Sequence, residues 1–316
     1  MNNLQAEMVI LDTLVPKKHT YRKLKAIIDF HKIVKAVVLP EKESLAGAIG
    51  FRLERLIMCL ILQFMEDLSD REMERFIAEN NAAKWFCDFS ITEKTPDYSV
   101  FSKVRKKLGC KQISNIFTEV QRQLKTKGYL TEVFTFIDAT ALTSKLSMWE
   151  EKDKSIQDGY EKLNNVNLPK YAKDKDVRIG AKSKTKFWFG YKKHVSVDTQ
   201  SGMINKVAVT KANVTDADGL KHVCPKTGAV LADKGYVGAI ATIEKKGAHP
   251  MVILKNNMKD KNKDKDRWIS GLRAPYEGTF SKQNKRTRYL GQVKNQAAEF
   301  LYAIAFNFRR LLVIEA

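Results

Sequence analysis

The sequence has few of the residues from which thiolate or imidazole metal sites are built. Its 316 residues include four cysteines and five histidines, and none of them has the spacing of metal ligands or of a disulfide framework. It also lacks a phosphate-binding P-loop lysine motif and the glycine fingerprint of dinucleotide-binding folds. These absences argue against a structural zinc protein, a disulfide scaffold and the common nucleotide-binding enzymes.

No segment of the sequence suits a membrane. The longest apolar run, Leu56–Leu62, is far too short to span a bilayer. Met1–Asp12 contains acids and no positively charged start, so it does not have the pattern of a signal peptide. We therefore expect a reduced, cytoplasmic protein with no membrane partner.

Positive charge is in excess. The chain has 56 Lys and Arg residues against 36 Asp and Glu residues, a formal net charge of +20. Such an excess favours a polyanionic partner, although many lysine-rich proteins have only a solvated surface. With 44% hydrophobic residues, the chain is expected to fold, and its length suits two domains.

Residues 1–128 predict an all-helical domain for DNA binding or assembly. Apolar residues recur at helical spacing over Tyr21–Val38, Phe51–Leu68 and Asp97–Leu108, and Gly109 is a good helix stop. The solvent face of the last helix carries four basic residues, Lys103, Arg105, Lys106 and Lys107. A helix-turn-helix that reads DNA and an ordinary bundle with a solvated basic face both fit this pattern.

Residues 129–316 predict a mixed α/β domain. Strands are expected over 133–140, 187–197, 203–209, 229–233 and 250–255, and a helix over about 294–313 closes the chain. Three antiparallel strands followed by two strands reached through helices is the order of a ribonuclease H-like sheet. The polar segment at about 143–186 interrupts that order, and its charge predicts a mobile insertion that becomes ordered on DNA.

Three acids fall where this fold order brings side chains together. Asp138 and Asp233 each follow an apolar strand, and Glu277 lies in a predicted helix. Taken singly, each acid is explained as a turn former or a surface carboxylate. Together, carboxylates at strand ends favour a site for hard divalent cations. Two such ions are suited to phosphoryl transfer on DNA.

Basic side chains follow the acids. Arg273 lies one helical turn before Glu277, where it would orient that carboxylate or grip a phosphate, or form a plain surface ion pair. His194 fits a packed histidine as well as a functional one. The side chains expected to contact DNA near the acids are Tyr191, Lys192, Lys193 and His194 on a strand, and Lys282, Lys285, Arg286 and Arg288 along the last part of the Glu277 helix and its exit.

The chain resembles bacterial insertion-sequence DDE transposases, in the insertion-sequence-five-like group with a helical N-terminal domain. The resemblance covers almost the whole length and rests on Leu68–Glu72, Thr95–Asp97 with Phe101 and Arg105, Phe136–Thr140, Gly190–Lys192 with His194, Ala232–Tyr236, Arg273 with Glu277 and Phe280, and Asn307–Arg310. It implies that Asp138, Asp233 and Glu277 are the catalytic triad and that two Mg²⁺ or Mn²⁺ ions are held per active site. It also implies double-stranded DNA partners, namely transposon ends and target DNA, and a homodimer in the synaptic complex. The expected location is the bacterial nucleoid.

Two departures from the family pattern limit what the resemblance implies about this chain. Ser270 and Asn284 stand where relatives often have a Tyr and a Lys, so Lys282 or Lys285 is the candidate to replace that lysine. The short stretch between Asp233 and Glu277 leaves little room for a β-rich insertion, which argues against hairpin intermediates. Two rival functions remain: a catalytically silent DNA-binding regulator and a metal-dependent nuclease without strand transfer.

Overall fold

The computed structural model divides into two compact units. One comprises Met1–Gln123 with Ile304–Ala316, and the other Leu124–Ala303. The structure describes residues 10–38, 50–144, 165–166, 168–183, 187–258, 261–281 and 285–316, without the side chains of 170, 171 and 277–281. The division predicted from the sequence placed the whole last helix in the second domain, whereas its residues from Ile304 onward cluster with the first unit.

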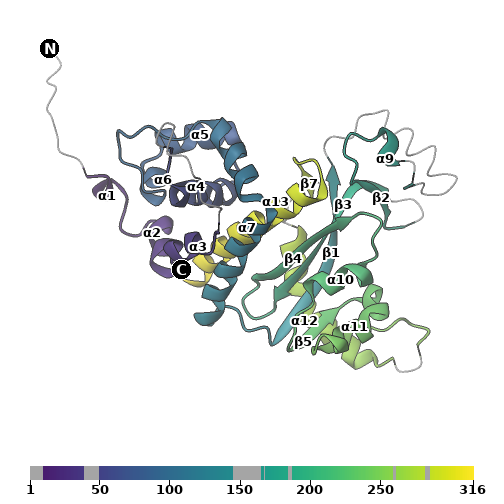
Figure 1. Ribbon diagram of the computed structural model, residues 1–316. Coiled ribbons are helices and arrows are strands. Elements are labelled where there is room, and N and C mark those ends of the chain that lie inside the picture. The colour runs from purple at the N-terminus through teal and green to yellow at the C-terminus, as the bar shows by residue number, and fades with distance from the viewer. Residues whose placement is uncertain are drawn as a thin grey trace, which may run out of the picture. The chain divides into compact units, whose positions relative to one another are not determined.

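The first unit is helical in its described residues (Figure 1). α4 forms its centre, since every side chain from Leu56 to Met65 is buried. The prediction of one helix over Tyr21–Val38 was wrong, because Ile28 is extended and Asp29 caps a new helix by accepting a hydrogen bond from Lys32 N at 3.1 Å. The helices are α1 (Leu11–Leu14), α2 (Thr20–Ile27), α3 (Phe30–Lys35), α4 (Leu53–Met65), α5 (Asp70–Glu79), α6 (Asn81–Phe86) and α7 (Tyr98–Thr126), the last broken at Gly109, where φ is 63°.

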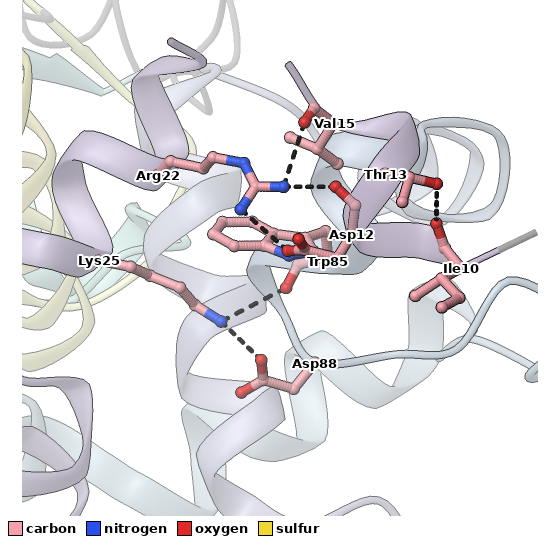
Figure 2. A network of polar contacts seen from close by, with 8 residues as sticks. All are labelled: Ile10, Asp12, Thr13, Val15, Arg22, Lys25, Trp85 and Asp88. Atoms are coloured by element: carbon pink, nitrogen blue, oxygen red, sulfur yellow. Dashed lines mark hydrogen bonds and ion pairs between the residues drawn. The ribbon is translucent and has the colours of Figure 1, made fainter. Parts of the chain in front are cut away.

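A network of polar contacts joins the first two helices of the first unit to α6 (Figure 2). The Arg22 guanidinium lies 4.5 Å from the centre of the Trp85 ring and pairs with Asp12 at 2.9 Å, while Trp85 Nε1 donates to the same carboxylate at 2.8 Å. Lys25 pairs with Asp88 at 2.5 Å and also faces the Trp85 ring. Charged and aromatic groups thus tie α1 and α2 to α6.

The second unit is built on a seven-stranded mixed sheet in the order β2-β3-β1-β5-β6, with β4 paired to β3 and β7 to β1. β1, β3 and β4 are antiparallel, and β1, β5 and β6 are parallel, which confirms the ribonuclease H-like fold. The strands are β1 (Phe134–Ser144), β2 (Arg178–Ala181), β3 (Phe187–Asp198), β4 (Ile204–Lys211), β5 (Ala229–Ala232), β6 (His249–Val252) and β7 (Arg286–Thr287). The helices are α9 (Leu168–Tyr171), α10 (Asp216–Val223), the 3₁₀ helix η1 (Lys234–Ala239), α11 (Ile240–Lys245), α12 (Lys263–Ser281) and α13 (Gln292–Ile314).

Helices cover both faces of this sheet. On one face, Ile137 of β1 packs with Leu220 of α10 and Ile243 of α11. On the other, Phe134 meets Trp268 of α12 at 6.2 Å between ring centres, and Lys193 of β3 pairs with Glu299 of α13 at 3.1 Å. Because side chains alternate along a strand, Phe136 and Asp138 belong to the face of α12 and α13.

Part of the predicted polar insertion is folded. Leu168, Ala172, Val177 and Ile179 are buried against β1, β3 and β4, and β2 pairs with β3. The prediction of a mobile insertion was therefore wrong for residues 168–183. Its remaining part, 145–164, 167 and 184–186, lies outside the described residues.

Candidate active site

Strand pairing brings Asp138 and Asp233 together. β1 and β5 are parallel with Phe136 opposite Leu231, so two residues further along β1 Asp138 falls level with Asp233, which directly follows β5. Adjacent strands lie about 4.8 Å apart. Asp138 was expected at the end of its strand, but β1 continues to Ser144 because its antiparallel partner β3 is longer than β5.

α12 runs beside β1 and carries Arg273 to the same place. Trp268 meets Phe134, and the Arg273 guanidinium lies 4.9 Å from the centre of the Phe136 ring. A helix rises about 1.5 Å per residue and a strand about 3.3 Å, so four more residues of α12 match two more of β1. That matching brings the backbone of Glu277 level with Asp138, while the Glu277 side chain is outside the described part.

The electrostatics of Asp138 show that like charges gather here. Burial, the nearby Asp233 and a further carboxylate, Asp216, raise the pKa of Asp138 to about 6. The hydrogen bond from Ala139 N, at 2.8 Å, and the charge of Arg273 oppose this shift. The positive charge of nearby protein groups such as Arg273 therefore offsets only part of the negative charge around Asp138.

Asp216 also adds negative charge to the surroundings of Asp138, and it was not predicted from the sequence. It is the first residue of α10, and Lys192 of β3 pairs with it at 2.8 Å while donating to Val214 O at 2.7 Å. Locally, Asp216 resembles any acid in the first turn of a helix capped by Thr215. Only the pairing of β3 with β1 shows that the α10 start lies near Asp138.

Tyr236 was also missed. It packs in the cluster that contains Ile137 and Leu220, and its hydroxyl is buried without a hydrogen-bond partner among the described residues. Burial, Asp216, Asp138 and Asp233 raise the pKa of Tyr236, while Arg273 lowers it. Its position three residues after Asp233 was visible in the sequence, but nothing in the sequence showed where its hydroxyl points.

The donor set suits a hard divalent cation. Asp138 and Asp233 each use one carboxylate oxygen to accept a backbone N–H, from Ala139 and Gly235, and their second oxygens are the natural metal ligands. Among the side chains that the structure describes, no three His, Cys, Asp or Glu residues are grouped to hold a metal ion. The third ligand expected from the sequence, Glu277, is outside that set.

Three residues expected to contact DNA are buried, and for them the prediction was wrong. Tyr191 is fully buried and donates to Asp174 at 2.7 Å, and Lys193 is buried in its ion pair with Glu299. His194 shares a hydrogen bond of 2.9 Å with Thr210, and burial lowers its pKa to about 4. The physical reason is that helices cover both faces of the sheet, so alternate side chains of β3 are all enclosed.

Arg105 also has a structural partner. It forms two hydrogen bonds with Asp70, at 2.9 and 2.6 Å, and a third with Gln63. Lys282 lies outside the described residues. α12 ends at Ser281, so residues 285–288 lie beyond the Glu277 helix, on and around β7, which pairs with Thr143 and Ser144 of β1. Exposed basic residues remain at Lys103, Lys106, Lys107, Lys285, Arg286 and Arg288.

The fold and the site define the class of protein. A ribonuclease H-like sheet with two carboxylates beside its parallel strands β1 and β5 suits metal-dependent phosphoryl transfer. Two family models match the chain: one described as Transposase DDE domain matches residues 131–307, and one described as Transposase domain (DUF772) matches residues 9–107. The first covers more than half of the chain.

The chain therefore belongs to the DDE transposase family, and it is an enzyme that cuts and transfers DNA. Members of this family use divalent metal ions and act on DNA. A solved structure is also similar: the cryo-EM structure of the piggyBac transposase synaptic complex with hairpin DNA, at 9% identity and a TM-score of 0.40, with 92% of this chain and 72% of that chain covered. In the part of the chain that the structure describes, no helix is long and apolar enough to cross a membrane.

Proposed function

We propose that the chain is the transposase of a bacterial insertion sequence, in the insertion-sequence-five-like group, and that it cuts the ends of that element and joins them to target DNA. The observation that supports this most directly is the register of β1 and β5, because it brings Asp138 level with Asp233 at the centre of the sheet. Arg273, against Phe136, adds a cation beside the two carboxylates.

Asp138, Asp233 and Glu277 would hold two Mg²⁺ or Mn²⁺ ions. When bound, such ions activate the attacking oxygen and stabilise the leaving oxygen. Asp138 on β1 would share the ions with Asp233, which follows the neighbouring strand β5, and with Glu277 of α12. The guanidinium of Arg273 lies 4.9 Å from the centre of the Phe136 ring, and the planar fork of a guanidinium matches the geometry of a phosphate.

The reaction has two steps. Water attacks the phosphodiester at an element end and frees a 3′-hydroxyl. That 3′-hydroxyl then attacks a phosphodiester of the target DNA, so a new phosphodiester joins the element end to the target and the target's own 3′-oxygen leaves as a hydroxyl. Lys192 is fixed by Asp216 and Val214 at the start of α10, where it adds positive charge near the site.

The exposed lysines of α7, namely Lys103, Lys106 and Lys107, together with Lys285, Arg286 and Arg288, would contact DNA phosphates. Two element ends must be held together for joining, so we expect a homodimer in the synaptic complex.

The test uses labelled double-stranded DNA from the regions that flank the coding sequence, incubated with the full chain and Mg²⁺. We expect nicks at the element ends and, with pre-cut ends and a supercoiled plasmid, joined products that carry the label. A silent regulator would retard the DNA and leave it uncut. A nuclease without strand transfer would cut it and yield no joined product, and either outcome would contradict the proposal.

A further inference from the structure

Three contacts join α5 and the start of α7 into one surface of the first unit. Arg105 of α7 pairs with Asp70 of α5 at 2.6 Å. The backbone N–H of Tyr98, the first residue of α7, donates to Glu74 of α5 at 3.1 Å. Arg71, the second residue of α5, adds the third contact, because its guanidinium carbon lies 4.9 Å from the centre of the Tyr98 ring. The first two turns of α5 are therefore fixed against the first residue of α7.

The acids on these two turns are engaged, whereas Arg71 faces solvent. Asp70 is held by Arg105, and Glu74 accepts the backbone hydrogen bond from α7. Glu72 closes the capping box by accepting from the backbone at the start of α5 at 2.7 Å. Arg71 is exposed and forms no ion pair with any side chain that the structure describes. Because it is exposed, its positive charge can reach a partner outside the chain.

The same surface continues along α7. Tyr98, Ser102 and Lys106 follow one another at intervals of four residues, so they lie on one face of the helix, and Lys103 lies beside them. All four are exposed, Tyr98 by 46%. On α5, the exposed Arg75 adds a further cation. An aromatic ring among exposed cations suits a polyanion, and the polyanion on which a transposase acts is DNA.

Stacking prepares the Arg71 guanidinium for a planar partner. An aromatic ring contacts the face of a guanidinium and leaves the N–H donors along its edge free to bind. Two of these donors match O6 and N7 of guanine, the commonest specific contact in the major groove of DNA. A side chain that is held in place before binding also loses less conformational entropy when it binds. Arg71 therefore has the chemistry of a residue that reads a base.

We propose that this surface of α5 and α7 binds the duplex at the element end. In that complex Arg71 donates to O6 and N7 of a guanine in the major groove, and Lys103 and Lys106 contact phosphates. The inference rests on the proposed function, since it requires the chain to recognise the ends of an element. It assigns base recognition to Arg71 and not to Arg105, whose donors are taken up by the fold.

Arg71→Lys in the full chain tests this, with Arg52→Lys as the matched control, since Arg52 at the start of α4 is also exposed. Dissociation constants are measured for a duplex from the regions that flank the coding sequence and for an unrelated duplex of the same length. We expect Arg71→Lys to lower the ratio of the two affinities by about 5- to 150-fold, because lysine keeps the charge and loses the fork. Affinity for the unrelated duplex and the melting temperature should stay the same. Arg52→Lys should match the unmodified chain in every measurement.

Lys106→Ala separates phosphate contact from base recognition. It should weaken binding to both duplexes by the same factor and lower the slope of the salt dependence by about one. The base is identified with 7-deazaguanine, which lacks the N7 acceptor and is placed at each guanine of the element end in turn. One such position should weaken binding by the unmodified chain and have little further effect on Arg71→Lys.

An Arg71→Lys chain that keeps the affinity ratio, or that loses affinity equally for both duplexes, would overturn the inference and leave the proposed function in place. The same holds if no 7-deazaguanine position affects the unmodified chain. An unmodified chain that binds both duplexes equally and cuts neither would reject the proposed function and this inference with it, so the two failures can be told apart.

Discussion

Asp138→Asn is expected to lower strand cleavage by at least about 1,000-fold, which corresponds to about 4 kcal/mol of activation free energy. Asparagine keeps the size of the side chain and removes the negative charge that would bridge two cations. Its effect should be the largest of any single change at the site, because Asp138 is central to the group of Asp233, Asp216 and Arg273.

The same substitution should not weaken the fold. The pKa of Asp138 is raised from 3.8 to about 6, so the metal-free chain loses stability as the pH rises from 3.8 to about 6, and the loss is complete above that value. Removing the charge should therefore stabilise the metal-free chain by up to about 3 kcal/mol at pH 7. Cleavage assays on end DNA, together with thermal unfolding, check both parts.

Asp264→Asn is the matched control, since that carboxylate is 90% exposed and at the first turn of α12. It should cut and unfold like the unmodified chain. Normal cleavage by Asp138→Asn would reject the assignment of this residue.

Asp198→Ala is expected to destabilise the second unit by about 3–5 kcal/mol. The Asp198 carboxylate is fully buried and accepts from the backbone N–H groups of Thr131, Glu132, Gln200 and Ser201 at 2.8–2.9 Å. Alanine leaves these donors without their acceptor. The melting temperature should fall by about 6–20 °C.

The pH dependence of Asp198 follows from the same contacts. Burial alone raises its pKa, but the hydrogen bonds from Ser201, Glu132 and Thr131 outweigh burial, and the pKa falls below its ordinary value of 3.8. The stabilisation is therefore complete above the unfolded pKa, and it is lost as the pH falls through the lower folded pKa. Unfolding of Asp198→Ala should depend less on acid than that of the unmodified chain, and an equal dependence would contradict this account.

The fold order was predictable because its signals are local. Apolar strands, the capping box of Ser69 and Glu72 and the helix break at Gly109 are each set by a few neighbouring residues, and the structure contains all three. The break at Asp29 was missed, because apolar spacing on both sides continued the helical pattern.

The residues around the site were less predictable, because their partners are distant in the sequence. The polar stretch that contains Tyr191, Lys193 and His194 suggests an exposed strand. Lys193 is nevertheless buried where it pairs with Glu299 of α13, and His194 is buried where Gly219 of α10 packs closely against its ring. A Cβ at Gly219 would lie 2.0 Å from His194 Cε1, so only glycine fits there. Such long-range contacts leave no periodic signal in the chain.

We propose that three acids from separate elements, Asp138, Asp233 and Glu277, hold the same metal ions. Iron-dependent cleavage of the protein backbone tests it directly: Fe²⁺ replaces Mg²⁺ in the full chain, and ascorbate with peroxide then produces radicals that cut the chain beside the bound iron. We predict cuts near residues 138, 233 and 277 that excess Mg²⁺ suppresses. Cuts that leave out the region of Glu277, or that persist in excess Mg²⁺, would contradict a shared site.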